Sequence, residues 1–546
     1  MARKPAFVQN RYRSGMYDRP NINLPLTYCQ NIENMVVDRE TLKSRGGISA
    51  FANGYSYPGE IQAVRQFWSN SGTPHTVVVS EGRVFRYDHA GSNPTEVTNG
   101  QTLSASADAR VKIREYDGGA WITDNVNPII YLPDESSGAV LFSTLNPGRV
   151  PSRAGAIEFF ENSLWLGNFT DFNEAATARR YATIQSQLAG ETDGIPGIAQ
   201  FLAEQGARND HNRAQAVQEL LEHDDGDLLI FQERGIRRAT FDPAPEQIGL
   251  SRTDFYYKTL TKESGLVAPN AAITTPLGTF YLDRRGPYWI PPGNPPQKPK
   301  YIGLPIETFW SGVDQNRLAY ANVTLVPELN GVMWNVPVGS ATTQNNRAIF
   351  AQFASWTNLD VDIESLHPAM SIFKGTGARP FSFNAACHIL DPESSPAYRK
   401  RCIVGDYNGK LWYLDEGTSD AGEDIICLWK PAKFGSPDFE WHWESVAVDM
   451  NLEAAKVLQM TATPYATGAA SDMDTVSAGT TYPGIGSGGF QIGVSAIAGS
   501  TLGRARADVQ VEPAPYLDLT CRVASNSLPV QVHQMLVFGK PGGSYN

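Results

Sequence analysis

The chain has 546 residues and carries 57 acidic against 45 basic side chains, a formal net charge of −12. Hydrophobic residues make up 41% and charged residues 19%, which supplies a large core and excludes a disordered chain. The negative charge disfavours a surface that grips nucleic acid, because neutralising phosphates requires clustered Lys and Arg. With 49 Gly and 36 Pro for turns, and 24 Phe, 22 Tyr and 11 Trp for pleated surfaces, the composition favours an all-β fold.

Residues 1–27 form a basic N-terminal arm. The sequence permits two interpretations: a frayed terminus, or an arm that docks on an acidic neighbouring subunit. No charged segment is followed by an apolar run at this end, and no run of about 18 apolar residues occurs anywhere. We therefore expect synthesis in a cytoplasm without a membrane anchor. The arm's basic residues, set against the single acid Asp18, are Arg3, Lys4, Arg11, Arg13 and Arg19.

Residues 28–51 predict a β-hairpin. Apolar residues at 35–36 lead into a charged turn at 38–40, and a polar return strand ends at 45–47.

Short strands recur from residue 61 onward and are joined by Gly, Asp or Asn turns. The pairs Glu81-Gly82 and Asp117-Gly118 mark two-residue hairpin turns. Four-stranded meanders of this kind build a propeller blade, so we expect a β-propeller over residues 28–430, with the number of blades open. Three hairpin glycines that follow a polar or charged residue are expected to have positive φ: Gly235, Gly286 and Gly409.

Two regions depart from this pattern. Residues 193–227 predict a helical hairpin inserted between blades, with an Asn209 or Asp210 cap on its second helix. It would either elaborate the rim or contact a neighbouring subunit. Residues 431–546 predict a C-terminal β-rich domain, a sandwich or an extra sheet, with a long exposed loop at 461–487.

An aromatic cluster at the start of that domain has two interpretations. Phe439, Trp441 and Trp443 alternate and would share one face of a strand. They would pack between the propeller and the C-terminal sheet, or form an exposed stacking platform.

No motif predicts a catalytic, cofactor or metal site, and we expect no cofactor. The glycine run at 484–489 lacks the strand-to-helix transition of a dinucleotide site. Residues 406–409, followed by Asp415 and Glu416, resemble the start of a calcium loop, but the strand pattern that follows favours a hairpin turn. Glycoside hydrolysis needs only two acids that the fold brings together. The candidate pairs are Asp360 with Asp362, Asp415 with Glu416, and Glu423 with Asp424.

The cysteines are odd in number and too widely spaced to be paired metal ligands, so we expect buried, reduced thiols. Cys387 and His388 would point to opposite faces of a strand, which disfavours a catalytic pair. The five cysteines are Cys29, Cys387, Cys402, Cys427 and Cys521.

The segment 28–51 also resembles the opening of β-propeller tail proteins from short-tailed bacteriophages. These are nozzle or hub proteins of the tail tubular protein B or packaged-DNA-stabilisation type, which close the tail channel below the portal. The matching residues in this segment are Asn31, Asn34, Asp38, Leu42, Arg45, Gly47 and Phe51. The resemblance recurs in order to about residue 460. Its further matching residues are Leu164, Trp165, Gly167, Phe231, Glu233, Arg234, Gly235, Gly265, Pro269, Gly278, Gly286, Gly405, Gly409 and Gly417.

The resemblance implies a structural virion protein, not an enzyme, that is made in the host cytoplasm and located in the tail. It implies a ring, with six copies expected, around the axial DNA path, gating the channel during genome retention and ejection. The implied partners are portal or adaptor proteins, tail fibre or spike proteins, and genomic DNA that passes without sequence-specific binding. The alternative is a carbohydrate-active propeller, tail-associated or secreted, that uses a carboxylate pair as a glycosidase or lyase.

Overall fold

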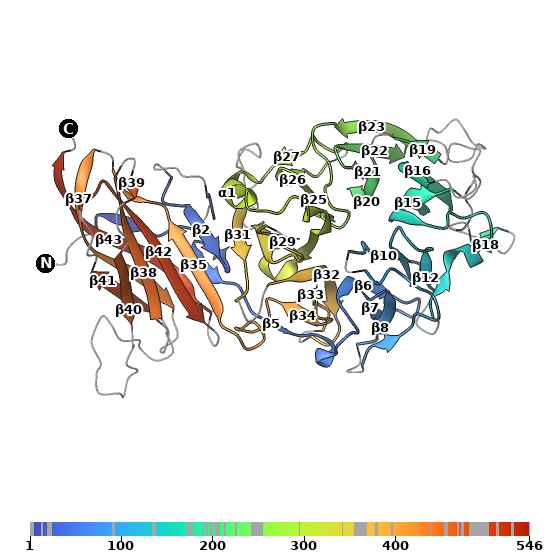
Figure 1. Cartoon of the computed structure of the whole chain (residues 1–546), viewed down its shortest axis with the longest axis horizontal. Helices are drawn as coiled ribbons and strands as arrows, with labels where there is room; N and C mark the ends of the chain where they lie inside the picture. Colours follow the sequence, from blue (N-terminus) through green and yellow to red (C-terminus); the bar gives the residue numbers. More distant parts are fainter. Residues whose placement is uncertain are drawn as a thin grey trace.

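The computed structural model describes most of the chain (Figure 1). The described residues are 5–12, 15–18, 24–89, 93–106, 108–133, 138–171, 178–188, 191–192, 195–196, 199, 201, 208–211, 215–223, 226–241, 255–293, 295–340, 342–353, 368–376, 381–394, 397–436, 438–451, 457–466, 469–470, 474–479, 502–508, 513–525 and 529–544.

Within these residues the fold is all-β, as expected, and seven four-stranded antiparallel meanders form a β-propeller. In chain order the blades are β6 (Ile61–Trp68), β7 (Pro74–Ser80), β8 (Arg83–Tyr87) and β9 (Thr95–Glu96); β10 (Lys112–Tyr116), β11 (Gly119–Thr123), β12 (Ile130–Leu132) and β13 (Val140–Leu141); β14 (Ala154–Phe160), β15 (Ser163–Thr170), β16 (Ala178–Leu188) and β19 (Arg208–Asp210); β20 (Val217–His223), β21 (Asp227–Gln232), β22 (Gly235–Phe241) and β23 (Phe255–Thr261); β24 (Ala272–Thr275), β25 (Gly278–Asp283), β26 (Gly286–Ile290) and β27 (Lys300–Tyr301); β28 (Asn322–Val326), β29 (Gly331–Val336), β30 (Arg347–Gln352) and β31 (Ala369–Phe373); and β32 (Phe383–Asp391), β33 (Arg399–Asp406), β34 (Leu411–Leu414) and β5 (Ile48–Ala50).

The N-terminal strand β5 closes the propeller. Strand β5 pairs antiparallel with β34, with Trp412 opposite Ala50. It thereby completes the seventh blade. The first strand of each blade contacts the first strand of the next, and β32 contacts β6, so these strands form a closed ring. A sheet closed in this way leaves only short outer edges exposed.

The hairpin turns follow the expected chemistry. Glu81 and Gly82 have φ of 49° and 73°, the left-handed pair that a two-residue hairpin requires. Gly286 and Gly409 also have positive φ, at 134° and 75°. Gly235 does not, so the prediction of a positive φ was wrong at that position.

The predicted second helix of a hairpin at 193–227 is wrong. Residues Val217–His223 form β20, the innermost strand of the fourth blade, and residues Arg208–Asp210 form β19. Apolar residues at 217, 220 and 221 fit one face of a helix, but they equally suit a strand that is buried on both faces. Most of the first predicted helix lies outside the described residues.

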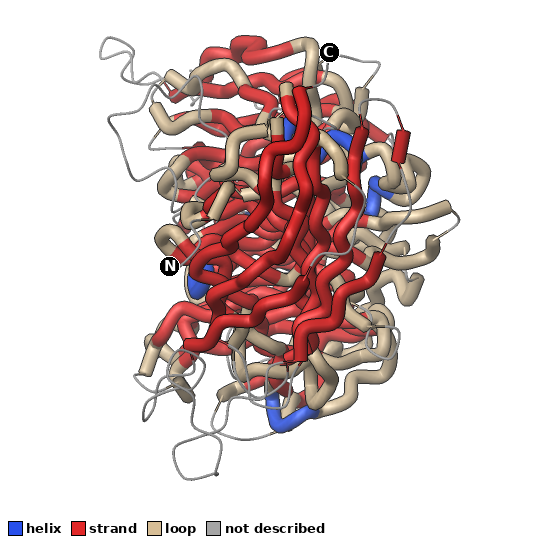
Figure 2. The backbone as a smooth tube through the Cα atoms, turned by 90° about the vertical axis from the view of Figure 1, so that its left-hand side faces the viewer, coloured by secondary structure: helices blue, strands red, loops and turns tan. Residues whose placement is uncertain are grey.

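A β-sandwich lies beside the propeller (Figures 1 and 2). Its first sheet contains β3 (Met35–Asp38), β4 (Thr41–Ser44), β43 (Gln531–Ser544), β37 (Phe439–Asn451) and β41 (Leu502–Asp508), with β1 (Phe7–Gln9) on β43. Its second sheet contains β2 (Cys29–Glu33), β35 (Ile425–Pro431), β42 (Tyr516–Ser525), β38 (Val457–Ala466), β39 (Ala469–Ala470), β40 (Asp474–Gly479) and β36 (Phe434–Gly435).

The sandwich is discontinuous in sequence, which corrects the expected boundaries. The hairpin β3–β4 was predicted correctly, but it pairs with β43 from the C-terminal region, and β2 pairs with β35 on one side and with β31 of the sixth blade on the other. Part of the expected arm is the strand β1, and strands β38 and β40 occupy parts of the expected loop at 461–487. A local pattern identifies a strand but does not identify its partner.

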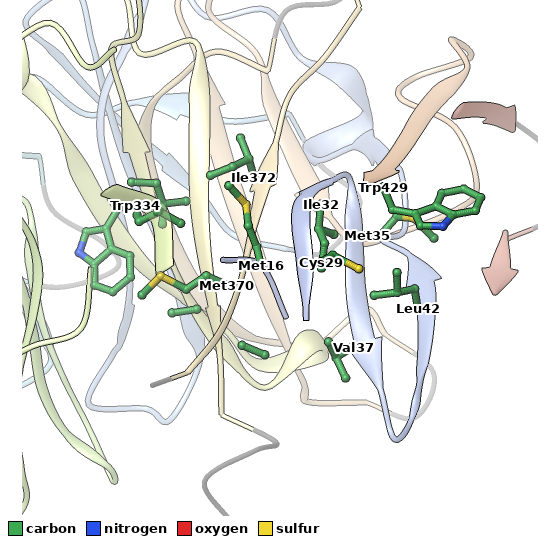
Figure 3. Close-up of a cluster of buried hydrophobic side chains, with 14 of the residues drawn as sticks. Met16, Cys29, Ile32, Met35, Val37, Leu42, Trp334, Met370, Ile372 and Trp429 are labelled. Carbon is green, nitrogen blue, oxygen red and sulfur yellow. The ribbon is translucent and has the colours of Figure 1, made fainter. Parts of the chain in front are cut away.

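One hydrophobic core joins the sandwich to the adjacent blades. Strand β2 runs parallel to β31 of the sixth blade, with Glu33 opposite Ile372. Figure 3 shows side chains of this core from both sides of the contact. They include Met16, Cys29, Ile32, Met35, Val37, Leu42, Trp334, Met370, Ile372 and Trp429.

Candidate functional site

A buried ion pair between Arg45 and Asp420 lies where the sandwich meets the propeller. Arg45 Nη1 and Nη2 donate to the two carboxylate oxygens of Asp420 at 2.8 and 2.6 Å. The two side chains are only 1% and 3% exposed. The guanidinium also lies 4.8 Å from the ring centroid of Phe381, which covers it. Because both charges are out of water, removing either partner would leave a buried charge without compensation.

Asn34 joins three parts of the chain at the same place. Its Nδ2 donates to the carbonyl oxygens of Lys374, after the sixth blade, and Ile426, in β35, at 2.8 and 2.9 Å. Its Oδ1 accepts hydrogen bonds from Arg45 Nε at 3.1 Å and from the Lys374 N–H at 2.9 Å. All the hydrogen-bonding positions of this amide are used, which holds the two domains in register.

Gly47 lets the chain pass close to the loop that follows β34. Its N–H donates to Gly417 O at 3.0 Å, and a Cβ on Gly47 would lie 1.9 Å from Ser419 O. The neighbouring Gly46 N–H donates to the Asp415 carboxylate. Burial raises the pKa of Asp415, although this hydrogen bond opposes the shift.

Four residues of the bacteriophage resemblance therefore meet at this junction: Asn34, Arg45, Gly47 and Gly417. Sequence reasoning missed Asp420, the partner of Arg45, because an acid in a polar turn gives no local sign of burial. The other resemblance residues do not meet at this junction, although Gly265 approaches the turn at Glu233 and Arg234 closely: a Cβ on it would lie 2.5 Å from Arg234 N. Asn31 and Leu42 lie in sandwich strands, Trp165 in the core of the third blade, Glu233 and Arg234 in the turn after β21, Gly265 and Pro269 before β24, Gly286 at the start of β26, and Gly405 and Gly409 in the seventh blade.

A second candidate site is a cavity of about 500 Å³ on the propeller axis. Residues from the first strands of all seven blades line it, namely β6, β10, β14, β20, β24, β28 and β32. The volume is that of a small-molecule site and is far less than a DNA duplex requires.

Lys112, in β10, is the most deeply buried cation at this cavity. Its Nζ forms an ion pair with Glu219 and donates to the carbonyl oxygens of Gln218 and Pro269 at 3.0 and 3.1 Å. All three ammonium donors thus have acceptors on the fourth blade or just after it. Burial nevertheless lowers the pKa of Lys112 to about 8.

Arg114, in the same strand, extends this network across a third blade. Its Nε donates to Glu158 at 3.0 Å and its Nη2 to Glu219 at 3.3 Å. The two carboxylates therefore share one guanidinium. In a glycosidase pair, by contrast, one carboxyl group gives its proton to the leaving oxygen and the other acts as base or nucleophile. The network is suited to joining blades.

The expected carboxylate pairs do not form a joint site in the described residues. Glu416, next to Asp415, accepts hydrogen bonds from Arg401 at 2.7 Å and from the Ser49 hydroxyl at 2.9 Å. Glu423 lies in the turn with Asp420, whose N–H donates to its carbonyl oxygen. Asp360, Asp362 and the glycine run at 484–489 lie outside the described residues.

Residues 406–409 form a hairpin turn, as predicted. Asp406 Oδ1 accepts the N–H groups of Asn408 and Lys410 at 2.9 and 2.8 Å, and its Oδ2 accepts the Trp412 indole N–H at 2.9 Å. The turn itself uses the carboxylate that a cation would need.

The remaining expectations concern cysteines and aromatics. All five cysteines are buried and free, and Cys387 and His388 point to opposite faces of β32, as predicted. Trp441 packs on Phe7 of β1, at 5.0 Å between ring centroids, and Phe439 is 43% exposed. Trp441 and Trp443 therefore pack against Phe7 inside the sandwich, whereas Phe439 is exposed, which corrects their expected shared place between the sandwich and the propeller. Within the described part of the chain, each helix is too short or too polar to span a bilayer.

The sequence matches no protein-family model and no curated protein. Solved structures of β-propeller proteins are similar in fold. A structure of YCF48 bound to D1 peptide is 12% identical, over 68% of this chain and 99% of that chain, with a TM-score of 0.37. An ancestral GH74 enzyme is 11% identical, over 74% of this chain and 52% of that chain, with a TM-score of 0.37. YCF48 from Cyanidioschyzon merolae is 8% identical, over 72% of this chain and 97% of that chain, with a TM-score of 0.26. At these values the likeness carries no argument about function.

Proposed function

We propose that this chain is a structural component of the tail of a short-tailed bacteriophage, a nozzle or hub protein that assembles as a ring and gates the DNA path. The observation that carries the proposal is the junction. The contacts at this junction join the propeller to the sandwich and do not line an open site. They are made by four residues that the resemblance singles out: Asn34, Arg45, Gly47 and Gly417. Contacts of this kind suit a structural protein, in which the propeller and the sandwich keep a fixed arrangement.

The axial cavity bears on where DNA would pass. Ion pairs from three blades line it, and its volume of about 500 Å³ cannot hold a duplex. In the proposed tail protein, several copies of the chain would form a ring. DNA would therefore pass along the axis of that ring, outside each propeller. Such a ring is built on heterologous interfaces that close by rotation, and six copies are expected from the resemblance.

Mass photometry and negative-stain imaging of the purified full-length protein test this proposal. We expect closed rings with a central opening, and particles assembled without the protein should lose their packaged genome. A chain that stays monomeric across the accessible concentration range, together with stable full particles that lack it, would overturn the proposal. Release of reducing sugar from bacterial polysaccharides would favour the carbohydrate-active alternative.

A further inference from the structure

Three side chains that could bind a metal meet where the first and seventh blades touch. His89 follows β8 of the first blade, Asp391 ends β32 of the seventh blade, and Glu393 lies in the turn after β32. One potential ligand atom of each residue lies within 4.8 Å of those of the other two. These residues belong neither to the junction nor to the axial cavity.

The His89 ring is buried with one nitrogen unused. The residue is 3% exposed, and its Nε2 lies 2.9 Å from Thr76 Oγ1. Its Nδ1 has no hydrogen-bond partner among the described residues. A buried polar atom without a partner is costly. When Nε2 carries the proton and donates it to Thr76, Nδ1 presents the lone pair that a metal ion requires, and the hydrogen bond fixes the tautomer.

The surroundings hold this ring in place. His89 has φ of 59°, a backbone conformation that a non-glycine residue keeps only when its neighbours impose it. The Tyr87 ring lies 4.8 Å from the imidazole between centroids, and the Phe51 ring lies 6.0 Å away. Phe51 follows β5, so the closing strand also contributes to the wall of the cluster.

Asp391 is fully buried and already oriented. Its Oδ2 accepts hydrogen bonds from Arg401 Nη1 at 2.9 Å and from the Tyr413 hydroxyl at 3.0 Å. Its Oδ1 accepts only the Glu393 N–H, at 3.0 Å, among the contacts that the described residues make with it, and keeps a second lone pair. Arg401 also pairs with Glu416 at 2.7 Å.

Two carboxylates, those of Asp391 and Glu393, lie close to the His89 imidazole. Glu393 is exposed, and the Tyr87 hydroxyl lies 3.1 and 3.2 Å from its two carboxylate oxygens. One imidazole and two carboxylates form a donor set that a dication can use.

We propose that His89 Nδ1 and one carboxylate oxygen each from Asp391 and Glu393 bind a divalent transition-metal ion, with Zn²⁺ as the expected metal and water completing the coordination. One imidazole and two carboxylates suit Zn²⁺, whereas Ca²⁺ and Mg²⁺ prefer sites made only of oxygen. Glu393 is exposed, so its side chain is able to turn toward the ion. Because one ligand comes from the first blade and two from the seventh, the ion would clamp the propeller at its closure and stabilise the folded state.

Calorimetric titration of tag-free, full-length protein with ZnCl₂, after chelation and removal of the chelator, tests the proposal. We expect one Zn²⁺ per chain and a higher melting temperature with the metal. The variant Glu393→Gln alters an exposed side chain and should fold normally, yet bind Zn²⁺ at least tenfold more weakly. His89→Ala should abolish binding. MgCl₂ and CaCl₂ should raise the melting temperature less than ZnCl₂ does.

His211→Ala is the matched control. His211 is also a buried propeller histidine, but its Nε2 lies 2.9 Å from Thr183 Oγ1 and its Nδ1 3.2 Å from Arg237 Nη1. Its loss should change stability without changing Zn²⁺ stoichiometry. Failure of the unaltered protein to bind one Zn²⁺ would overturn the proposal, as would binding by Glu393→Gln at unchanged affinity. The second outcome decides the matter even if His89→Ala does not fold.

Discussion

Buried ion pairs occur at both the domain junction and the propeller axis, but they are built differently. At the junction, Asp420 is the one carboxylate among the described residues that pairs with Arg45, and it does so through both oxygens. At the axis, Glu219 has two cationic partners, Lys112 and Arg114, beside a cavity. Loss of one charge can be compensated at the axis by the remaining partner or by solvent. Within the part of the chain that the structure describes, the junction pair lacks a second partner of this kind. Substituting one of its charges should therefore destabilise the protein more than substituting a charge at the axis.

Arg45→Met should have the largest effect. It leaves the Asp420 carboxylate buried without its cation, which should lower the free energy of unfolding by about 3–5 kcal/mol. Denaturant unfolding followed by tryptophan fluorescence measures the loss. Arg83→Met is the control, because Arg83 pairs with Glu96 at 3.7 Å with side chains 52% and 45% exposed, and such pairs contribute less than about 1 kcal/mol. Equal losses of unfolding free energy in the two variants would show that the junction pair stabilises the fold no more than an exposed ion pair does.

Gly47→Ala should rank next, because the added Cβ would meet Ser419 O and force the two domains apart. Overpacking of this kind costs about 1–3 kcal/mol. Gly72→Ala is the matched control: its φ of 81° strains an Ala, but no atom of the described residues lies within 4 Å of the added Cβ. The Gly47 variant should therefore melt at the lower temperature, and the opposite order would contradict the close approach at the junction.

A pH titration distinguishes the axis from the junction. The pKa of Lys112 is about 8 in the folded chain, against an ordinary value of 10.5. Between about pH 8 and 10.5 the unfolded chain therefore holds a proton that the folded chain has released, so the stability contributed by Lys112 rises with pH in this window. The difference in unfolding free energy between the unaltered protein and Lys112→Met should rise accordingly. A flat difference would mean that Glu219 keeps Lys112 protonated throughout.

The sequence patterns predicted strands and turns well where the decision is local. The turns at Glu81-Gly82 and at residues 406–409 depend on a few adjacent residues, and both formed as expected. The helix predicted through residue 217 failed, because its apolar spacing is shared by helices and doubly buried strands. Pairing of β3–β4 with the C-terminal β43 joins residues almost 500 positions apart, so no local pattern could identify it.

The site residues show the same contrast between local and long-range information. Arg45 and Asn34 stood out because a whole segment resembled a known opening, yet Asp420, the partner of Arg45, lies 375 residues further along the chain. His89 was a lone histidine in sequence, and only propeller closure brings Asp391 beside it. Residues that interact across the propeller closure or across the domain contact can be recognised only once the fold is known.

The smallest effect is expected on DNA. With a net charge of −12 and an axial cavity too small for a duplex, the purified protein should show no measurable duplex binding by fluorescence anisotropy at near-physiological salt. Lys112→Met should leave that result unchanged, because its ammonium is already held by Glu219 and two carbonyl groups. Tight, salt-sensitive binding that Lys112→Met abolishes would show that the axis holds nucleic acid. The two ion-pair regions would then differ in function as well as in their tolerance of substitution.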